Sequence, residues 1–304
     1  MPDASSVLID GPWTHRDYTA NGIRLHVAEA GEGPLVLLLH GFPQFWWCWR
    51  QQIGVLAEAG YRVVAPDLRG YGASDKPPRG YDAVTLTADI AGLVGALGER
   101  DAMVVGHDWG GLIGWTMGAL HPRAVRSLVI LSMPHPRRLR PGIVSTGRAL
   151  AASRYVFAAQ LPKVPELRLT ANDGAYVETM LREWSGPVWR GTADFAAAAR
   201  RYRSAIQIPQ AAYGAMEYYR WAVRSAPRAD GLRYAKRMAN PVAVPTLQLH
   251  GALDPCLLTD TVDGSGRYVD AAYNYTVLDA IGHFPHEEAP ELVSAQILAW
   301  AGRT

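Results

Sequence analysis

Short apolar runs alternate with helix-like segments along the first 131 residues, and this alternation limits the fold more than any other feature of the sequence. Runs with the composition of sheet strands occupy residues 23–27, 35–39, 62–65, 102–105 and 125–131. Helical patterns lie between them, over residues 49–59, 84–97 and 111–120. Strands that alternate with helices predict an α/β protein with a doubly wound, mostly parallel sheet.

The alternation stops after residue 135 and resumes near residue 245. Residues 136–229 carry mostly helical patterns and no convincing strand. Strand patterns return at residues 245–250 and 273–278, and residues 290–301 are expected to form a closing helix. A stretch of this length is too long for a loop. We therefore expect a core formed by residues 1–135 and 230–304, with a helical cap over residues 136–229 that covers the ligand crevice of the sheet.

Composition and charge exclude several classes of protein. Lys and Arg number 30 against 28 Asp and Glu, a net charge of +2, which provides no field for binding nucleic acid. The only two cysteines, Cys48 and Cys256, lack disulfide or zinc-site spacing, and we expect both to be inert. No signal-peptide pattern opens the chain, and the longest aliphatic run, residues 35–39, is too short to span a membrane. These features predict a cytoplasmic protein.

Asp108 stands at the sharpest predicted turn, in the segment Gly-His-Asp-Trp-Gly-Gly between a strand and a helix. Hydrolases that cleave esters carry a nucleophilic Ser at this turn, with glycines where the backbone is crowded. A carboxylate is already ionised near neutral pH and suits attack on an sp³ carbon, which gives an alkyl ester. The alternative interpretation is that Asp108 only caps the following helix.

Two further residues complete a catalytic pattern. Asp254 follows one late strand and His283 follows the last, so the order nucleophile, acid, histidine is that of the α/β-hydrolase fold. We expect His283 to take a proton from water and Asp254 to orient its ring. Other aspartates remain alternatives to Asp254, namely Asp260, Asp263 and Asp279. His286 is expected at the surface.

The segment His-Gly-Phe-Pro at residues 40–43 follows the strand at 35–39. In this fold the loop at that place supplies one backbone N–H of the oxyanion hole, and the residue after the nucleophile supplies another. We assign these donors to Phe42 and Trp109. Pro43 allows a cis peptide bond that would aim the Phe42 N–H inward. A plain tight turn is the alternative.

Together these motifs resemble those of the α/β-hydrolase-fold epoxide hydrolases of the soluble and microbial kind. The resemblance covers nearly the whole chain and includes Asp-Leu-Arg-Gly-Tyr-Gly-Ala-Ser-Asp at residues 67–75 and Gly-His-Phe at 282–284. It implies an eight-stranded sheet with a helical cap and a small, apolar epoxide as substrate. It also implies a vicinal diol as product, with no cofactor and no metal. The resemblance leaves open whether the protein forms a homodimer.

The resemblance further implies two cap tyrosines that hold the epoxide oxygen. Tyr155, in the segment 155–162, and Tyr219, in Glu-Tyr-Tyr-Arg-Trp, lie where such tyrosines are expected. A phenol can donate a hydrogen bond or a proton to the opening ring. Each could instead be a packing residue. Tyr218 is the direct competitor of Tyr219, and Tyr202 and Tyr213 are weaker ones.

Large aromatic side chains could form the wall of an apolar pocket between core and cap. We expect substrate contacts from Phe42, Trp47, Trp109, Trp184 and Trp221, with Trp189 as a further candidate. Core packing is the alternative for each tryptophan except Trp109, whose position is fixed by its neighbour Asp108.

Two other functions remain. A haloalkane or haloacid dehalogenase shares the Asp at the turn but needs halide-binding donors in place of the tyrosine pair. A non-catalytic ligand-binding protein of the same fold would have no need for the complete set of residues.

Overall fold

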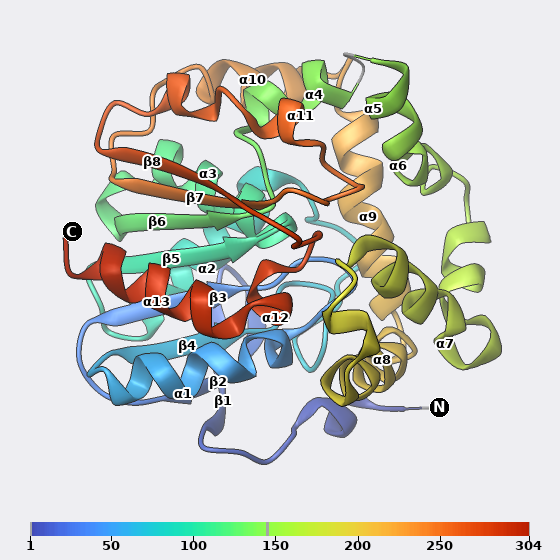
Figure 1. The fold of residues 1–304 in the computed structure, drawn as a ribbon, viewed down its shortest axis with the longest axis horizontal. Coiled ribbons are helices and arrows are strands. Elements are labelled where there is room, and N and C mark those ends of the chain that lie inside the picture. The colour runs from blue at the N-terminus through green and yellow to red at the C-terminus, as the bar shows by residue number, and fades with distance from the viewer. Residues whose placement is uncertain (1, 144–145, 304) are drawn as a thin grey trace.

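An eight-stranded sheet forms the centre of the computed structural model, which describes residues 2–143 and 146–303 (Figure 1). The strands lie in the order β1-β2-β4-β3-β5-β6-β7-β8. Their bounds are β1 (Thr14–Ala20), β2 (Ile23–Ala30), β3 (Leu35–Leu39), β4 (Arg62–Pro66), β5 (Ala102–His107), β6 (Val125–Leu131), β7 (Thr246–Gly251) and β8 (Tyr273–Leu278). Strand β2 is antiparallel to β1 and β4, and all other pairs are parallel. The mostly parallel sheet is confirmed; β1, which was not predicted, is added at its edge.

Helices cover both faces of the sheet (Figure 1). On one face α1 (Arg50–Glu58) packs beside α13 (Pro290–Ala301), and on the other α2 (Ala83–Ala96) packs beside α3 (Trp109–Leu120). Every residue of β3, β5 and β7 is consequently buried, as apolar strands between two helical layers should be. Short elements complete the core: η1 (Ala4–Val7), η2 (Trp46–Trp49), η3 (Pro122–Ala124), α11 (Thr259–Val262), η5 (Ser265–Tyr268) and α12 (Pro285–Glu288).

The chain between β6 and β7 is helical, and its described residues contain no strand. Its elements are α4 (Pro136–Ile143), α5 (Gly147–Ala152), α6 (Arg154–Ala158), α7 (Val164–Trp184), η4 (Trp189–Gly191), α8 (Ala193–Ile206), α9 (Ala211–Arg224) and α10 (Ala229–Arg237). Helix α7 is interrupted at Ala171–Gly174, where the backbone leaves helical geometry. The expected border between residues 229 and 230 falls at the first residue of α10.

This helical segment lies over the carboxyl ends of the strands. The ring of Trp184 at the end of α7 lies 5.6 Å from that of His283, which follows β8. The ring of Tyr219 in α9 lies 5.5 Å from that of Phe42, which follows β3. The carboxyl ends of the strands, where α/β sheets bind their ligands, therefore lie beneath this helical segment, which is called the cap below.

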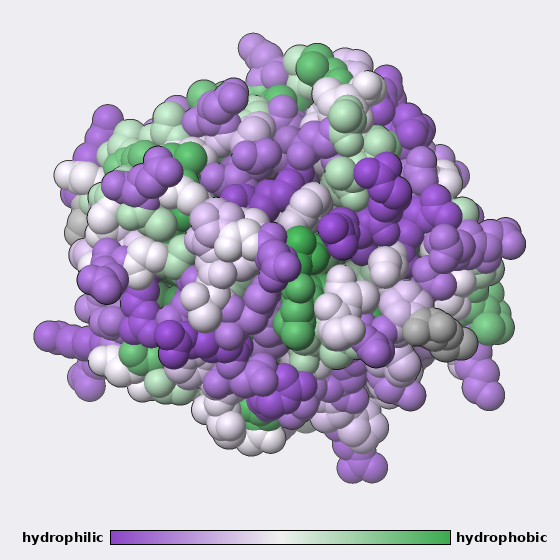
Figure 2. All heavy atoms as spheres, turned by 90° about the horizontal axis from the view of Figure 1, so that it is seen from below, coloured by the Kyte–Doolittle hydropathy of each residue, from purple (hydrophilic) through white to green (hydrophobic). Residues whose placement is uncertain are grey.

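The outer surface is predominantly polar on the face shown in Figure 2, where hydrophobic side chains form small separate patches. Across residues 2–143 and 146–303, no helix combines the length and the apolar character that a membrane crossing requires.

Candidate active site

Asp108 forms the turn between β5 and α3. Its backbone has a φ of 49° and a ψ of −116°, a conformation that non-glycine residues rarely adopt. Neighbouring glycines make the turn possible, because a Cβ on Gly106 would lie 2.3 Å from the Gly110 carbonyl oxygen and one on Gly110 would lie 2.2 Å from the Leu39 oxygen. The Asp108 side chain makes no capping hydrogen bond to α3. Asp108 thus occupies the N-cap position of α3 without capping it through its side chain, which leaves the carboxylate for another role.

The loop after β3 brings a backbone donor to this carboxylate. The Phe42 N–H donates to Asp108 Oδ1 over 2.9 Å, and the Phe42–Pro43 peptide bond is cis, as the sequence allowed. A Cβ on Gly41 would lie 2.5 Å from Asp108 Cβ, so this close approach requires glycine. Trp109, the other expected donor, begins α3 directly after Asp108.

His283 lies between two carboxylates. Its Nδ1–H donates to Asp254 Oδ2 over 2.8 Å, and its Nε2 lies 3.7 Å from Asp108 Oδ2. The second oxygen of Asp254 accepts the backbone N–H groups of Cys256 and Leu257, over 2.8 and 3.0 Å. Among the aspartates considered, the structure brings Asp254 to the histidine.

The charges of His283 and Asp254 follow from their burial and from the groups beside them. Burial alone would lower the pKa of His283, but the carboxylates of Asp254 and Asp108 outweigh it and raise that pKa to about 10. Burial likewise opposes ionisation of Asp254, yet the neighbouring imidazole holds its pKa below the usual range. The resting site is thus an imidazolium between two acidic side chains.

Contacts that the sequence did not reveal hold the His283 loop. Glu288 accepts backbone N–H groups on both sides of His283, from Gly282 (2.9 Å) and Phe284 (3.0 Å), and also one from Gly186 of the cap (2.7 Å). The His283 N–H itself donates to the Trp184 carbonyl oxygen over 2.8 Å. Core and cap therefore share the support of this loop.

The expectation for His286 was wrong, because this side chain is fully buried. The chain turns back into α12 directly after His283, and this places the His286 ring 4.4 Å from that of Trp49 and 4.5 Å from that of His107. Burial lowers the pKa of His286 well below its usual range, so the ring is neutral at physiological pH.

Two cap tyrosines face the turn that carries Asp108. The rings of Tyr155 in α6 and Tyr219 in α9 lie 5.7 Å apart, and Tyr219 lies 5.0 Å from Trp109. Burial raises the pKa of both phenols well above the usual range, which keeps them protonated and able to donate. The competing tyrosines have other partners: Tyr218 donates to the Arg69 carbonyl oxygen, Tyr213 to that of Pro78, and Tyr202 to Glu287.

Two neighbouring cavities meet at the tyrosine pair. The smaller, of about 40 Å³, is lined by Asp108, Trp109, Tyr155 and Tyr219. The larger, of about 160 Å³, also reaches both tyrosines. Most of its other lining residues are apolar: Phe42, Ala158, Ala159, Leu161, Val164, Pro165, Leu169, Met180 and Met216, with Tyr176 and Arg168. An apolar molecule with one reactive polar group suits this space.

The expected pocket tryptophans divide into two groups. Trp109 lines the smaller cavity, and Trp184 lines neither, but its ring lies 5.1 Å from that of Tyr155 and 6.3 Å from that of Phe42, which do line a cavity. The structure does not bring Trp47 or Trp221 to either cavity wall. Trp47 packs under the Arg50 guanidinium at 4.0 Å, and Trp221 packs 5.3 Å from Tyr234.

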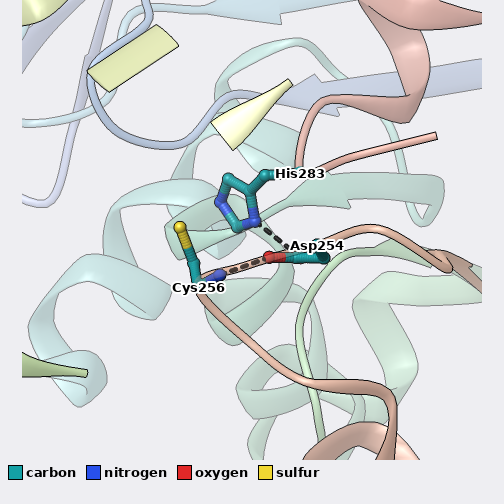
Figure 3. Close-up of side chains that lie close together, drawn as sticks. All are labelled: Asp254, Cys256 and His283. Atoms are coloured by element: carbon teal, nitrogen blue, oxygen red, sulfur yellow. Dashed lines mark hydrogen bonds and ion pairs between the residues drawn. The ribbon is translucent and has the colours of Figure 1, made fainter. Parts of the chain in front are cut away.

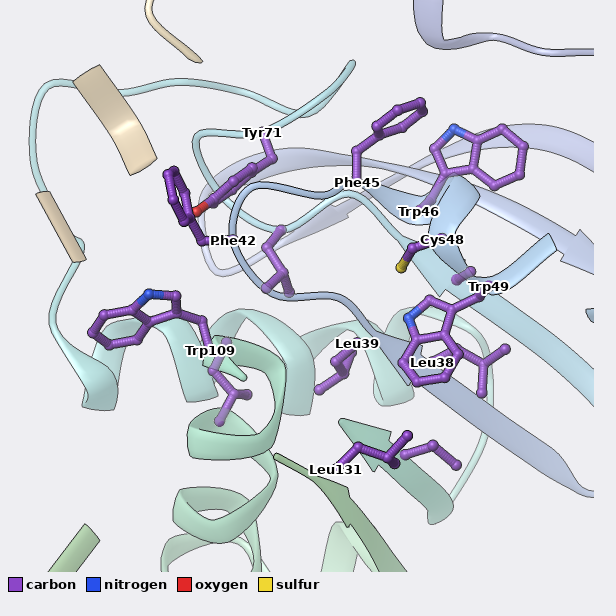
Figure 4. Close-up of a cluster of buried hydrophobic side chains, with 14 of the residues drawn as sticks. Leu38, Leu39, Phe42, Phe45, Trp46, Cys48, Trp49, Tyr71, Trp109 and Leu131 are labelled. Atoms are coloured by element: carbon purple, nitrogen blue, oxygen red, sulfur yellow. The ribbon is translucent and has the colours of Figure 1, made fainter. Parts of the chain in front are cut away.

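Three residues of the aromatic segment 46–49 belong to the buried core (Figure 4). Trp46, Cys48 and Trp49 lie together in the core, apart from Phe42 and Trp109. All three are fully buried, so the aromatic character of this segment is explained by packing. Trp189, the further candidate, packs 5.1 Å from Phe195 within the cap.

Comparisons with known proteins agree with this arrangement. The family model described as alpha/beta hydrolase fold matches residues 34–290. AB hydrolase superfamily protein YfhM of Bacillus subtilis is 34% identical over 285 residues, which cover 92% of this chain and 95% of that protein. Epoxide hydrolase A of Mycobacterium tuberculosis is 31% identical over 317 residues, covering 95% and 97%. The crystal structure of epoxide hydrolase VrEH1 from Vigna radiata superposes with a TM-score of 0.80 at 30% identity, over 96% of this chain and 98% of that one.

The sheet order, the turn at Asp108 and the family match define the class: the chain belongs to the α/β-hydrolase fold family. Within that family it is an epoxide hydrolase-like enzyme, because its similarity to proteins named epoxide hydrolase extends over most of its length in both sequence and structure.

Proposed function

We propose that this enzyme converts apolar epoxides into vicinal diols through a covalent ester on Asp108. The observation that carries the proposal is that the Asp108 carboxylate and the phenols of Tyr155 and Tyr219 line one cavity, while the carboxylate-paired imidazole of His283 lies 3.7 Å from Asp108. A carboxylate can open a strained ring, and the phenols supply the proton that the ring oxygen needs.

In the first half-reaction, Asp108 Oδ attacks a ring carbon and the bond from that carbon to oxygen breaks. Tyr155 and Tyr219 hydrogen-bond the leaving oxygen, and one of them transfers its proton to it. The products are a hydroxyalkyl ester and a phenolate. The proton held by His283 then returns the phenolate to phenol, which leaves a neutral imidazole beside the ester.

In the second half-reaction, His283 takes a proton from water and the hydroxide adds to the ester carbonyl of Asp108. The Phe42 and Trp109 N–H groups donate to the oxyanion. Collapse releases the second hydroxyl of the diol, which takes the proton from His283. The new carboxylic acid on Asp108 then gives its proton back to the imidazole, so the site returns to its resting charge.

The variant His283→Gln tests the order of these steps. It retains the nucleophile and both phenols, so the first half-reaction should proceed and the ester should accumulate. Mass spectrometry of the intact variant after mixing with styrene oxide should show the added mass, localised by proteolysis to the peptide that contains Asp108. Steady diol production by this variant at the wild-type rate would contradict the role of His283.

A dehalogenase is the second candidate, and one observation favours it. The buried Nε1–H of Trp109 lies beside the Tyr219 phenol without a hydrogen bond of full geometry, and such a donor could turn to a departing halide. The paired phenols of Tyr155 and Tyr219 favour the epoxide, because a halide leaves without needing a proton. Measuring halide release from 1-haloalkanes beside diol formation from styrene oxide separates the two activities.

A further inference from the structure

A second cluster of reactive side chains lies within the site. Asp254, Cys256 and His283 each place one oxygen, sulfur or nitrogen atom within 4.8 Å of the other two, and all three side chains are buried (Figure 3). In the part of the chain that the structure describes, no other three side chains of the His, Cys, Asp and Glu types come together this closely. The sequence suggested that Cys256 is inert, but it stands beside the catalytic histidine.

The three donors form a set that selects a particular class of ion. A thiolate, an imidazole and a carboxylate together suit Zn²⁺ or Cd²⁺, whereas Mg²⁺ and Ca²⁺ prefer oxygen ligands alone. Tetrahedral zinc holds nitrogen and oxygen ligands about 3.3 Å apart. The Asp254–His283 pair, at 2.8 Å, needs to open by a few tenths of an ångström, and the thiol needs to move inward.

The surroundings favour a cation. The carboxylate of Asp108, 3.7 Å from His283, adds a negative charge next to the cluster. His250 adds a second imidazole beside the cluster, because it is fully buried, its Nδ1 lies 3.9 Å from Asp254 Oδ2, and its ring meets the Leu257 backbone without a hydrogen bond of full geometry. This imidazole is available as a further ligand. Leu257, next to Cys256, lines the smaller cavity, so the cluster adjoins the space that substrate enters.

We propose that Asp254, Cys256 and His283 form an inhibitory binding site for a soft divalent cation such as Zn²⁺ or Cd²⁺. The cation displaces the thiol proton of Cys256 and a proton of the imidazolium, and both protons leave to solvent. An imidazole whose lone pair is bound to the metal cannot take a proton from water, so ester hydrolysis stops. Binding of the cation is independent of the proposed function, whereas the inhibition rests on it.

Direct binding is measured with Cd²⁺, because a Cd–thiolate bond gives an ultraviolet charge-transfer band. The full-length protein is titrated with CdCl₂, alongside the variants Cys256→Ser and Cys256→Ala and the matched control Cys48→Ser. Cys48 lies in the core beside Trp46 and Trp49 (Figure 4) and is not a member of the cluster. We expect the band in the wild type and in Cys48→Ser. Both Cys256 variants should lack the band, and their affinity for Cd²⁺ should be at least about 10-fold weaker than that of the wild type. A band of equal strength in a folded Cys256 variant, or no band in the wild type, would overturn the proposal.

Inhibition is measured for each variant as the rate of styrene oxide hydrolysis with Cd²⁺ divided by the rate without it. The ratio should fall at least about 10-fold in the wild type and Cys48→Ser, and EDTA should restore it. It should change by less than about twofold in the Cys256 variants, and MgCl₂ should have no effect. Inhibition that persists without Cys256 would contradict the proposal. If no epoxide turns over, the proposed function fails while the Cys256-dependent band still tests the site.

Discussion

Replacing Glu288 by Gln should slow one half-reaction and spare the other. The Glu288 carboxylate accepts three backbone N–H groups, two of which flank His283, while the third belongs to Gly186 of the cap. An amide has one acceptor oxygen, so at least one bond is lost and the remaining ones lose their charge assistance. At about 1.5–3 kcal/mol for a hydrogen bond to a charged group, we expect the free energy of unfolding to fall by about 2–4 kcal/mol.

The catalytic effect follows from the place of these bonds. Without them the loop that carries His283 can shift, and a displacement of about 1 Å costs roughly 100-fold in rate. Only the step that uses His283 as a base is affected, because Asp108 is held by β5 and α3. We therefore expect ester hydrolysis to slow by about 10- to 100-fold while ester formation changes by less than about threefold.

Rapid-quench single-turnover experiments measure the two steps separately. Ester on the protein is followed by mass spectrometry and diol by chromatography, and chemical denaturation gives the stability. Glu291→Gln is the matched control, because Glu291 is exposed in the first turn of α13. Unchanged ester hydrolysis in a Glu288→Gln variant that has lost stability would refute the positioning role. Equal slowing of both steps would refute it as well, since a general structural defect would produce that result.

Two further predictions concern the phenols and the imidazole. Tyr155→Phe and Tyr219→Phe should each slow ester formation by about 10- to 100-fold, measured by stopped flow. The control Tyr218→Phe should lower only the free energy of unfolding, by about 1 kcal/mol in chemical denaturation. His283 has a folded pKa of about 10 against about 6.5 when unfolded, so its ion pairs stabilise the fold fully below pH 6.5 and less as pH rises toward 10. The wild type should therefore lose up to about 5 kcal/mol more than His283→Gln between these pH values, and parallel stability curves would contradict the ion-paired imidazolium.

Local backbone chemistry explains how much of the site the sequence could predict. Asp108 stands at a turn whose flanking glycines are adjacent in sequence, and those glycines are required by contacts below 2.5 Å. The strand before it and the helix after it are visible in the pattern of apolar residues. Asp254 and His283 also directly follow strands, so the shared edge of a parallel sheet brings them together with Asp108.

Contacts between distant parts of the chain explain what the sequence could not show. Trp184 and Trp221 both lie on cap helices, and no local feature says that Trp184 faces His283 while Trp221 faces Tyr234. The bond from Gly186 to Glu288 joins residues about a hundred positions apart. The spacing along the sequence between Cys256 and His283 does not match a known ligand motif, because His283 comes from another loop.

In the proposed mechanism, the spacing of the two carboxylates around His283 lets one imidazole serve both half-reactions. Asp254 is the larger cause of the raised pKa of His283, and the carboxylate of Asp108, 3.7 Å away, raises it further. Esterification of Asp108 removes that second charge, so the pKa of His283 falls when the ester forms. The imidazole thus becomes a free base at the moment when an ester is present to be hydrolysed. Asp254 remains charged throughout and keeps the ring oriented, so the acid that attacks the substrate is also the group that controls the base.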